Sequence, residues 1–150
     1  MKKSGVVEVL LIEDDDADVE LVRILLDSRA DLRLTIEKNG QSALSYLQTL
    51  KADHQPLPGL ILLDINLPGR NGFEILDEIK ADPTLKVIPV VVMSSSGFWR
   101  DIFRAYESYA NSYIQKAVDF EEFKRKMTVV LDYWFSATAL PTHQSTELTT

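Results

Sequence analysis

An alternation of short apolar runs with amphipathic stretches most constrains what this chain can fold into. Runs rich in β-branched and other apolar residues occupy 6–12, 32–37, 60–63 and 88–93, with a weaker run at 112–115. Between and after them, apolar residues recur at the three- and four-residue spacing of amphipathic helices over 17–28, 41–51, 73–81, 99–109 and 120–135. The pattern predicts five strands, each followed by a helix.

The predicted strands at 60–63 and 88–93 are almost unbroken hydrophobics, as strands covered on both faces must be. Right-handed crossovers turn such an alternation into a parallel sheet with helices on both sides. We therefore expect an α/β fold with a doubly wound five-stranded parallel sheet of order 2-1-3-4-5, the flavodoxin-like topology, and five helices. We assign residues 1–135 to this domain and 136–150 to a C-terminal extension that is partly flexible.

Charge and hydropathy exclude several classes of protein. Sixteen basic against 23 acidic residues give a net charge of -7, which disfavours binding to a nucleic-acid backbone. The longest apolar runs fall far short of the roughly 20 residues that span a bilayer. Glu8 interrupts the apolar stretch after the N-terminal lysines, so no secretion signal is recognisable. We expect a cytoplasmic protein that binds neither nucleic acid nor membrane.

Acidic residues follow two strands that this topology places side by side. Glu13 and Asp14 follow the first run and Asp64 follows the third. In a doubly wound sheet, ligands bind beyond the carboxyl ends of the strands where the strand order reverses. Carboxylates gathered there repel one another unless a cation neutralises them, and hard oxygen ligands suit Mg²⁺. Asp15 or Asp16 has a simpler explanation, as a cap of the first helix.

A hydroxyl and an ammonium flank the same crevice. Ser94 ends the fourth run and Lys116 follows the fifth. Taken singly, each is an ordinary residue at a strand end. Beside a carboxylate and Mg²⁺, the two can hold the oxygens of a phosphoryl group, whose transfer depends on positioning and charge neutralisation. A carboxylate can itself be the nucleophile and form an acyl phosphate.

Four separated segments carry a family resemblance: LLIED at 10–14, DINLPGRNG at 64–72, VVVMS at 90–94 and YIQK at 113–116. In this order they resemble a response-regulator receiver domain over roughly residues 6–135, and four motifs in register are more specific than any one. The resemblance implies that Asp64 accepts a phosphoryl group from a phosphohistidine of a sensor kinase. It also implies that Asp14, Asp64 and the backbone carbonyl of Asn66 bind Mg²⁺, with Glu13 acting through a coordinated water.

The same resemblance assigns a conformational switch. Ser94 is then the switch hydroxyl that closes on the phosphoryl group, Tyr113 the aromatic residue that follows it inward, and Lys116 the partner of a phosphoryl oxygen. Receiver domains usually follow this lysine with a proline in a cis bond, whereas Ala117 follows here. A cis bond before a residue other than proline costs about 2.5 to 4 kcal/mol. The isomer of the Lys116–Ala117 bond, and with it the placement of Lys116, is left open.

Further features resemble one group within the family. The loop at 54–59, the segment IPVVVMSSS, the missing proline after Lys116 and the ending LDYWFSATALP are similar to single-domain regulators of cyanobacterial phytochrome histidine kinases. This implies a light-sensing kinase as partner and an output made by phosphorylation-dependent contacts. The chain is then a phosphoacceptor rather than an enzyme, apart from self-phosphorylation from small phosphodonors and slow autodephosphorylation. In the family, the side chains at the positions of Asn66 and Ser96 tune the rate of dephosphorylation and hence the lifetime of the acyl phosphate.

The last helix predicts both core and contact residues. One stripe should dock on the sheet: Phe120, Phe123, Met127, Val130 and Trp134. Three further apolar residues lie off this stripe: Val129, Tyr133 and Phe135. We expect a homodimer interface formed by these residues together with the segments 99–109 and 112–115. Scattered surface hydrophobics are the simpler alternative. Four aromatic residues extend this surface unless they belong to the core: Phe98, Trp99, Phe103 and Tyr106.

Three other functions remain as alternatives. Phosphohydrolases of the haloacid-dehalogenase type resemble this pattern, but Asn66 stands where they carry the aspartate that acts as general acid. A flavodoxin-like flavin site needs hydroxyls and amides after the first strand, where this chain has acids. A receiver fold acting as a phosphorylation-independent scaffold differs only in chemical reactivity.

Overall fold

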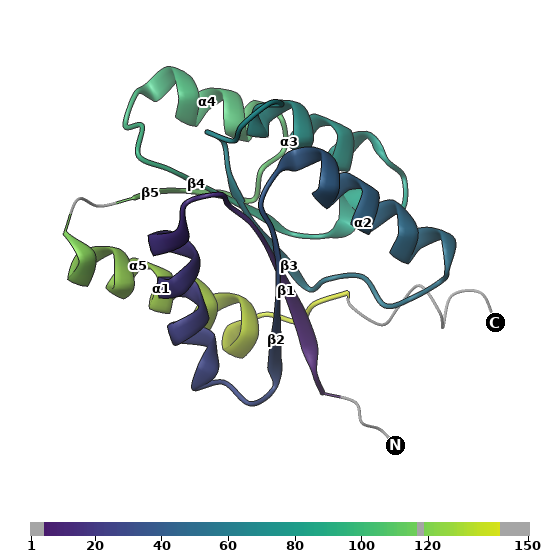
Figure 1. Cartoon of the computed structure of the whole chain (residues 1–150), viewed down its shortest axis with the longest axis horizontal. Helices are drawn as coiled ribbons and strands as arrows, with labels where there is room; N and C mark the ends of the chain where they lie inside the picture. The colour runs from purple at the N-terminus through teal and green to yellow at the C-terminus, as the bar shows by residue number, and fades with distance from the viewer. Residues whose placement is uncertain (1–4, 117–118, 142–150) are drawn as a thin grey trace.

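The computed structural model describes residues 5–116 and 119–141 (Figure 1). The strands are β1 (Val7–Ile12), β2 (Leu32–Glu37), β3 (Leu60–Asp64), β4 (Val90–Ser94) and β5 (Ser112–Gln115). The helices that alternate with them are α1 (Asp16–Asp27), α2 (Gly40–Ala52), α3 (Gly72–Ala81), α4 (Trp99–Glu107) and α5 (Phe120–Asp132). A 3-10 turn at Leu85–Val87 precedes β4, and a π-helical turn at Tyr133–Ala137 follows α5.

The strands form one parallel sheet in the order β2-β1-β3-β4-β5. Helices α1 and α5 cover one face, and α2, α3 and α4 cover the other (Figure 1). The predicted fold class and strand order are confirmed. The order reverses between β1 and β3, so the carboxyl ends of these two strands open onto the expected crevice.

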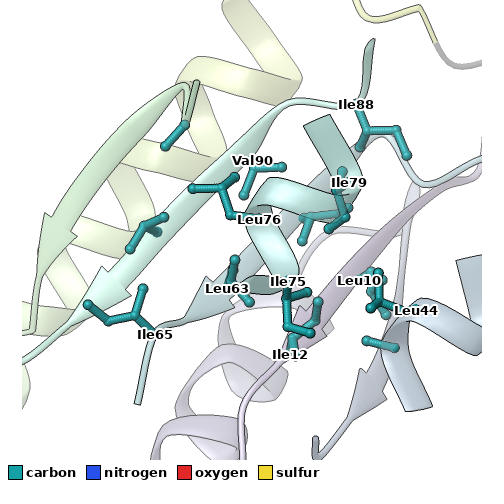
Figure 2. Packing of buried hydrophobic residues seen from close by; sticks show 14 of the residues in the cluster. Leu10, Ile12, Leu44, Leu63, Ile65, Ile75, Leu76, Ile79, Ile88 and Val90 are labelled. Carbon is teal, nitrogen blue, oxygen red and sulfur yellow. The ribbon is translucent and has the colours of Figure 1, made fainter. Parts of the chain in front are cut away.

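Each face of the sheet packs a separate hydrophobic cluster. On one face, Leu10 and Leu63 of the sheet meet Ile75, Leu76 and Ile79 of α3, all of them buried (Figure 2). On the other face, α1 and α5 cover the alternate strand residues Val9, Leu11, Leu60, Leu62, Val91 and Met93. Full burial of one such side chain contributes about 1.5 to 3 kcal/mol. Burial on both faces is why β3 and the chain before Ser94 read as continuous hydrophobics.

Some element boundaries differ from those predicted. β4 begins at Val90 rather than at residue 88, because the 3-10 turn ends there with the Ile88 N–H donating to the Leu85 carbonyl (3.0 Å) and Pro89 has no N–H to donate. Asp64 is the last residue of β3 rather than the residue after it, and Ser94 is the last residue of β4. Their side chains therefore start from the sheet itself.

Two expectations for the last helix were wrong. Phe120 is exposed, so the stripe that docks on the sheet begins at Phe123. Phe135 is partly buried against the α1–α5 cluster, as is Trp134. The π-helical turn is wider than an α-helical turn, so it changes the angular spacing of side chains and turns both residues towards the sheet.

Some predictions fall partly outside the described residues. The isomer of the Lys116–Ala117 bond does so because Ala117 is not described, as do residues 142–150 of the predicted C-terminal extension. Among the described residues, no helix is long and apolar enough to cross a membrane.

Asp82 links α2, α3 and the 3-10 turn. Its carboxylate accepts hydrogen bonds from Lys51 Nζ (2.7 Å) and from the backbone N–H groups of Thr84 (2.8 Å) and Leu85 (3.0 Å). Burial alone would raise the pKa of Asp82, but Lys51 and the two backbone donors lower it to about 2. The ionised form is therefore stabilised by the fold.

Replacing Asp82 with Ala should lower the free energy of unfolding by about 1 to 2 kcal/mol at neutral pH. The folded pKa of about 2 lies below the ordinary value of 3.8, so the stabilisation is present above pH 3.8 and is lost as the pH falls towards 2. The difference between wild type and variant should shrink over that window. Urea unfolding at neutral and acid pH measures it.

Asp77→Ala is the matched control, because Asp77 is exposed on α3. It should change the unfolding free energy by less than about 0.5 kcal/mol. Equal losses in both variants would contradict the role of Asp82, and so would a loss that stays constant as the pH falls.

Candidate functional site

Three carboxylates meet at the carboxyl ends of β1 and β3. Glu13 and Asp14 follow β1 directly, and Asp64 ends β3. One oxygen from each carboxylate lies within 4.8 Å of the other two. Glu13 is fully buried and Asp64 is 3% exposed, while Asp14 is open to solvent. The structure thus brings together three acids that the sequence spreads over fifty residues.

Local contacts fix the chain on both sides of this cluster. A Cβ added to Gly72 would lie 2.4 Å from the Ile65 Cα and 2.6 Å from the Asp64 carbonyl oxygen, so only glycine allows α3 to start this close to β3. The backbone N–H of Asn66 donates to Asp64 Oδ1 (3.0 Å). On the β1 side, Asp15 caps α1 by accepting from the Ala17 N–H (2.8 Å), as the sequence suggested for Asp15 or Asp16.

Lys116 lies at the centre of the acids. Its Nζ is 2.9 Å from Glu13 Oε1, 2.8 Å from Asp18 Oδ2 and 3.4 Å from Asp64 Oδ2. Its backbone N–H donates to the Ser94 carbonyl (2.7 Å), which holds the end of β5 beside β4. The lysine therefore reaches the acids although the residue after it is not proline.

The buried charges alter one another's ionisation. Burial, together with the neighbouring Asp64 carboxylate, raises the pKa of Glu13 well above its ordinary value of 4.5. Burial would lower the pKa of Lys116, but Asp18, Glu13 and Asp64 raise it above its ordinary value of 10.5. Positive charge is strongly favoured at this crevice.

The chemistry of the donor set fits a hard divalent cation. Carboxylate oxygens are the ligands that Mg²⁺ and similar ions take, and Glu13, Asp14 and Asp64 offer three in one cluster. Exposed Asp14 leaves one side open to solvent, which suits ions that keep part of their water shell.

The predicted switch residues Ser94 and Tyr113 lie on β4 and β5, and both contact Ser96 in the loop after β4. Ser94 is buried, and its Oγ accepts from the Ser96 N–H (3.0 Å) and from Asn66 Nδ2 (3.5 Å). The Tyr113 hydroxyl donates to the Ser96 carbonyl (2.9 Å), and the Tyr113 ring packs against the hydrophobic cluster on the α3 face. Ser96 Oγ in turn donates to Asp101 Oδ2 (2.6 Å), which ties this loop to α4.

Asp18 is the site residue that sequence reasoning missed. It lies in the first turn of α1 and makes the shortest of the three contacts with Lys116. A signal was present in the sequence, because Asp18 is four residues after Asp14 and the N-terminus of α1 faces the same edge of the sheet.

Comparisons with known proteins agree with this geometry. The family model described as "Response regulator receiver domain" matches residues 9–128. Response regulator Rcp1 of Synechocystis sp. is 38% identical over 135 residues, which cover 89% of this chain and 92% of Rcp1.

Two solved structures share the fold. The phosphorylated cyanobacterial phytochrome response regulator RcpA has 37% identity and a TM-score of 0.85, over 91% of this chain and 99% of RcpA. The Mn²⁺-bound form of Rcp1 has 36% identity and a TM-score of 0.84, over 90% of this chain and 99% of that one. The match to the family model and the similarity to Rcp1 both extend over most of the sequence. This chain therefore belongs to the response regulator receiver domain family.

Proposed function

We propose that Asp64 is the phosphoacceptor of this response regulator and receives its phosphoryl group from a sensor histidine kinase. The observation that carries the proposal is the environment of Asp64, which ends a buried strand beside both the Lys116 ammonium and the carboxylates of Glu13 and Asp14. A nucleophile, a fixed positive charge and a cation-binding cluster share one crevice. These are the groups that phosphoryl transfer needs.

In the proposed reaction, a carboxylate oxygen of Asp64 forms a bond to the phosphorus of the donor's phosphohistidine. The bond between phosphorus and the imidazole nitrogen breaks, and the nitrogen keeps the electron pair and takes a proton from water. The product is an acyl phosphate on Asp64 and a neutral histidine on the kinase. Lys116 faces a phosphoryl oxygen and offsets its charge.

Asp14, Asp64 and the backbone carbonyl of Asn66 would hold Mg²⁺, and Glu13 would contribute through a water. When bound, Mg²⁺ offsets the negative charge of the phosphoryl oxygens. Support comes from the carboxylate cluster and from Rcp1, whose solved structure contains Mn²⁺. The general acid of a haloacid-dehalogenase-type hydrolase is absent, since Asn66 stands in that place.

Ser94 and Tyr113 would change their contacts in response to the new charge on Asp64. Phosphorylation adds about two negative charges and three acceptor oxygens at one point. The Ser94 hydroxyl is buried at the end of the neighbouring strand, and Tyr113 is joined to the loop after that strand through the Ser96 carbonyl. The loop between β4 and α4 is thus the element whose two arrangements would carry the signal to α4, β5 and α5.

A phytochrome-type histidine kinase is the partner that we propose. The similarity to RcpA, which is a cyanobacterial phytochrome response regulator, supports it. The cytoplasm, where such a kinase would present its phosphohistidine, is the proposed location. Failure of Asp64 to react would instead favour a phosphorylation-independent scaffold.

We also propose a homodimer formed through α4, β5 and α5. β5 is an edge strand, and Val129 and Tyr133 beside it are exposed and line a surface hollow with Trp134. Exposed aromatic residues continue the apolar surface along α4: Phe98, Trp99, Phe103 and Tyr106. Phe135 is left out of this contact because it packs against the core. An apolar strip beside an edge strand suits a two-fold interface.

Incubation with acetyl phosphate and Mg²⁺ should add one phosphoryl group to the wild type, read as intact mass. Asp64→Asn should show no gain, because the nucleophile is lost, and chelation of the metal by EDTA should abolish the gain in wild type. Asp53→Asn, an exposed aspartate at the end of α2, is the control and should react like wild type. A gain in Asp64→Asn, or none in a folded wild type, would refute the acceptor.

Asn66→Ala should shorten the lifetime of the acyl phosphate by a factor of about three to ten without preventing its formation. The Asn66 side chain is exposed over the crevice with its amide nitrogen 3.5 Å from Ser94 Oγ, so truncation admits water. Decay of the phosphorylated mass after removal of the donor measures the lifetime. Ser96→Ala should also change the decay, and exposed Ser95→Ala should leave it unchanged. Wild-type decay in both Asn66→Ala and Ser96→Ala would contradict this role.

Light scattering after size-exclusion chromatography should give wild type twice the chain mass of 17.0 kDa, before or after phosphorylation. Val129→Asp should shift the protein to the monomer, because a buried unpaired carboxylate opposes association. Ile24→Asp is the control, since Ile24 is a similarly exposed apolar residue on α1. A monomeric wild type in both states would rule the dimer out.

A further inference from the structure

Asp18 contacts the proposed catalytic lysine from outside the carboxylate cluster. Its Oδ2 lies 2.8 Å from Lys116 Nζ, and the two side chains are 22% and 14% exposed. The position of Asp18 is set by the start of α1, since its backbone N–H donates to the capping Asp15 Oδ1 (3.1 Å). A helix end thus presents this carboxylate to the crevice.

The three carboxylates that accept from Lys116 differ in their other proposed contacts. An ammonium has three N–H donors, and here they face Asp18, Glu13 and Asp64. Glu13 and Asp64 also belong to the cluster that would hold the cation, and Asp64 would carry the phosphoryl group. Asp18 is not part of that cluster. It is the acceptor that can keep its bond to Lys116 when the other two turn to metal and phosphate.

We propose that Asp18 is a positioning residue that holds the Lys116 ammonium beside the phosphoacceptor. This inference rests on the proposed function of Asp64 and Lys116. Asp18 touches neither the phosphoryl group nor the metal, and it acts through Lys116 alone. One of the three lysine donors stays on Asp18, and the others remain directed at Asp64 and its phosphoryl oxygens.

A simpler explanation is a general effect of charge at the start of α1. An acid in the first turn interacts favourably with the helix dipole wherever its side chain points. Asp16 separates the two explanations, because it lies in the same turn and carries the same charge but is exposed and pairs with Lys38. Asp16→Asn is therefore matched to Asp18→Asn in charge and position on the helix.

The first test compares phosphorylation rates with acetyl phosphate and Mg²⁺. Asp18→Asn should slow the reaction about tenfold, because the bond to a charged donor is weakened. Asp18→Glu should recover part of the rate, and Asp16→Asn should stay within about twofold of wild type. The Mg²⁺ concentration that gives half the maximal rate should be the same in all. A faster Asp18→Asn, equal effects of Asp16→Asn and Asp18→Asn, or a raised Mg²⁺ requirement would overturn the proposal.

The second test asks whether Asp18 acts through the lysine. In a Lys116→Met background, adding Asp18→Asn should change the rate by less than about twofold, because the two residues form one unit. A slowing by the same factor as in wild type would mean that Asp18 acts on the fold or on the acceptor by another route. Thermal unfolding of each variant identifies any that do not fold.

The third test needs no phosphorylation. In the NMR spectrum of lysine ammonium groups, an ordered, slowly exchanging Nζ signal should be present in wild type and absent in Lys116→Met. Asp18→Asn should lose that signal and Asp16→Asn should keep it. Absence of the signal in wild type, or its survival in Asp18→Asn, would refute the contact. If the signal behaves as expected but Asp64 does not react, the contact holds and the proposed phosphoacceptor function fails.

Discussion

The burial of carboxylates at the ends of two central strands is the constraint on which this structure depends. An ionised group removed from water costs several kcal/mol unless an opposite charge and hydrogen bonds compensate. Glu13 is fully buried, and Asp64 nearly so, yet one ammonium, that of Lys116, faces both. The described part of the crevice therefore remains short of positive charge. A divalent cation bound by the carboxylates would supply that charge. The same positive charge is what the proposed phosphoryl transfer requires.

The sheet can keep these charges close together because hydrophobic packing on both faces fixes its strands. The hydrophobic clusters fix β1, β3 and β4, so their last residues stay in register: Asp64 lies opposite Met93, and Ser94 opposite Gln115. The close approach of Gly72 to the Asp64 carbonyl lets α3 begin directly beside the end of β3. The sheet thus presents the acids and the Ser94 hydroxyl to the loop and helix that would change arrangement in the proposed switch.

The residue pattern alone predicted the features that are set within a single strand or helix. Continuous hydrophobicity identified β3 and β4, and the acids after β1 and β3 followed from the strand order. The π-helical turn that packs Phe135 partly against the core depends on tertiary packing and has no local signal. Asp18 was missed for a related reason, because a carboxylate in the first turn of a helix already has an ordinary role there. What distinguishes Asp18 is its contact with Lys116, which follows β5, a strand two positions along the sheet from β3.

The residue that follows the lysine connects these observations. A proline after Lys116 would fix its own backbone angle and restrict the lysine as well, so part of the placement of the side chain would be built into the chain. Ala117 imposes neither restriction. The lysine is then positioned by what it touches: the Ser94 carbonyl through its backbone, and Asp18 through its ammonium. Because Asp18 is carried by α1, the helix after β1 becomes part of the site, and a change that moves α1 should alter phosphorylation chemistry without touching the acceptor.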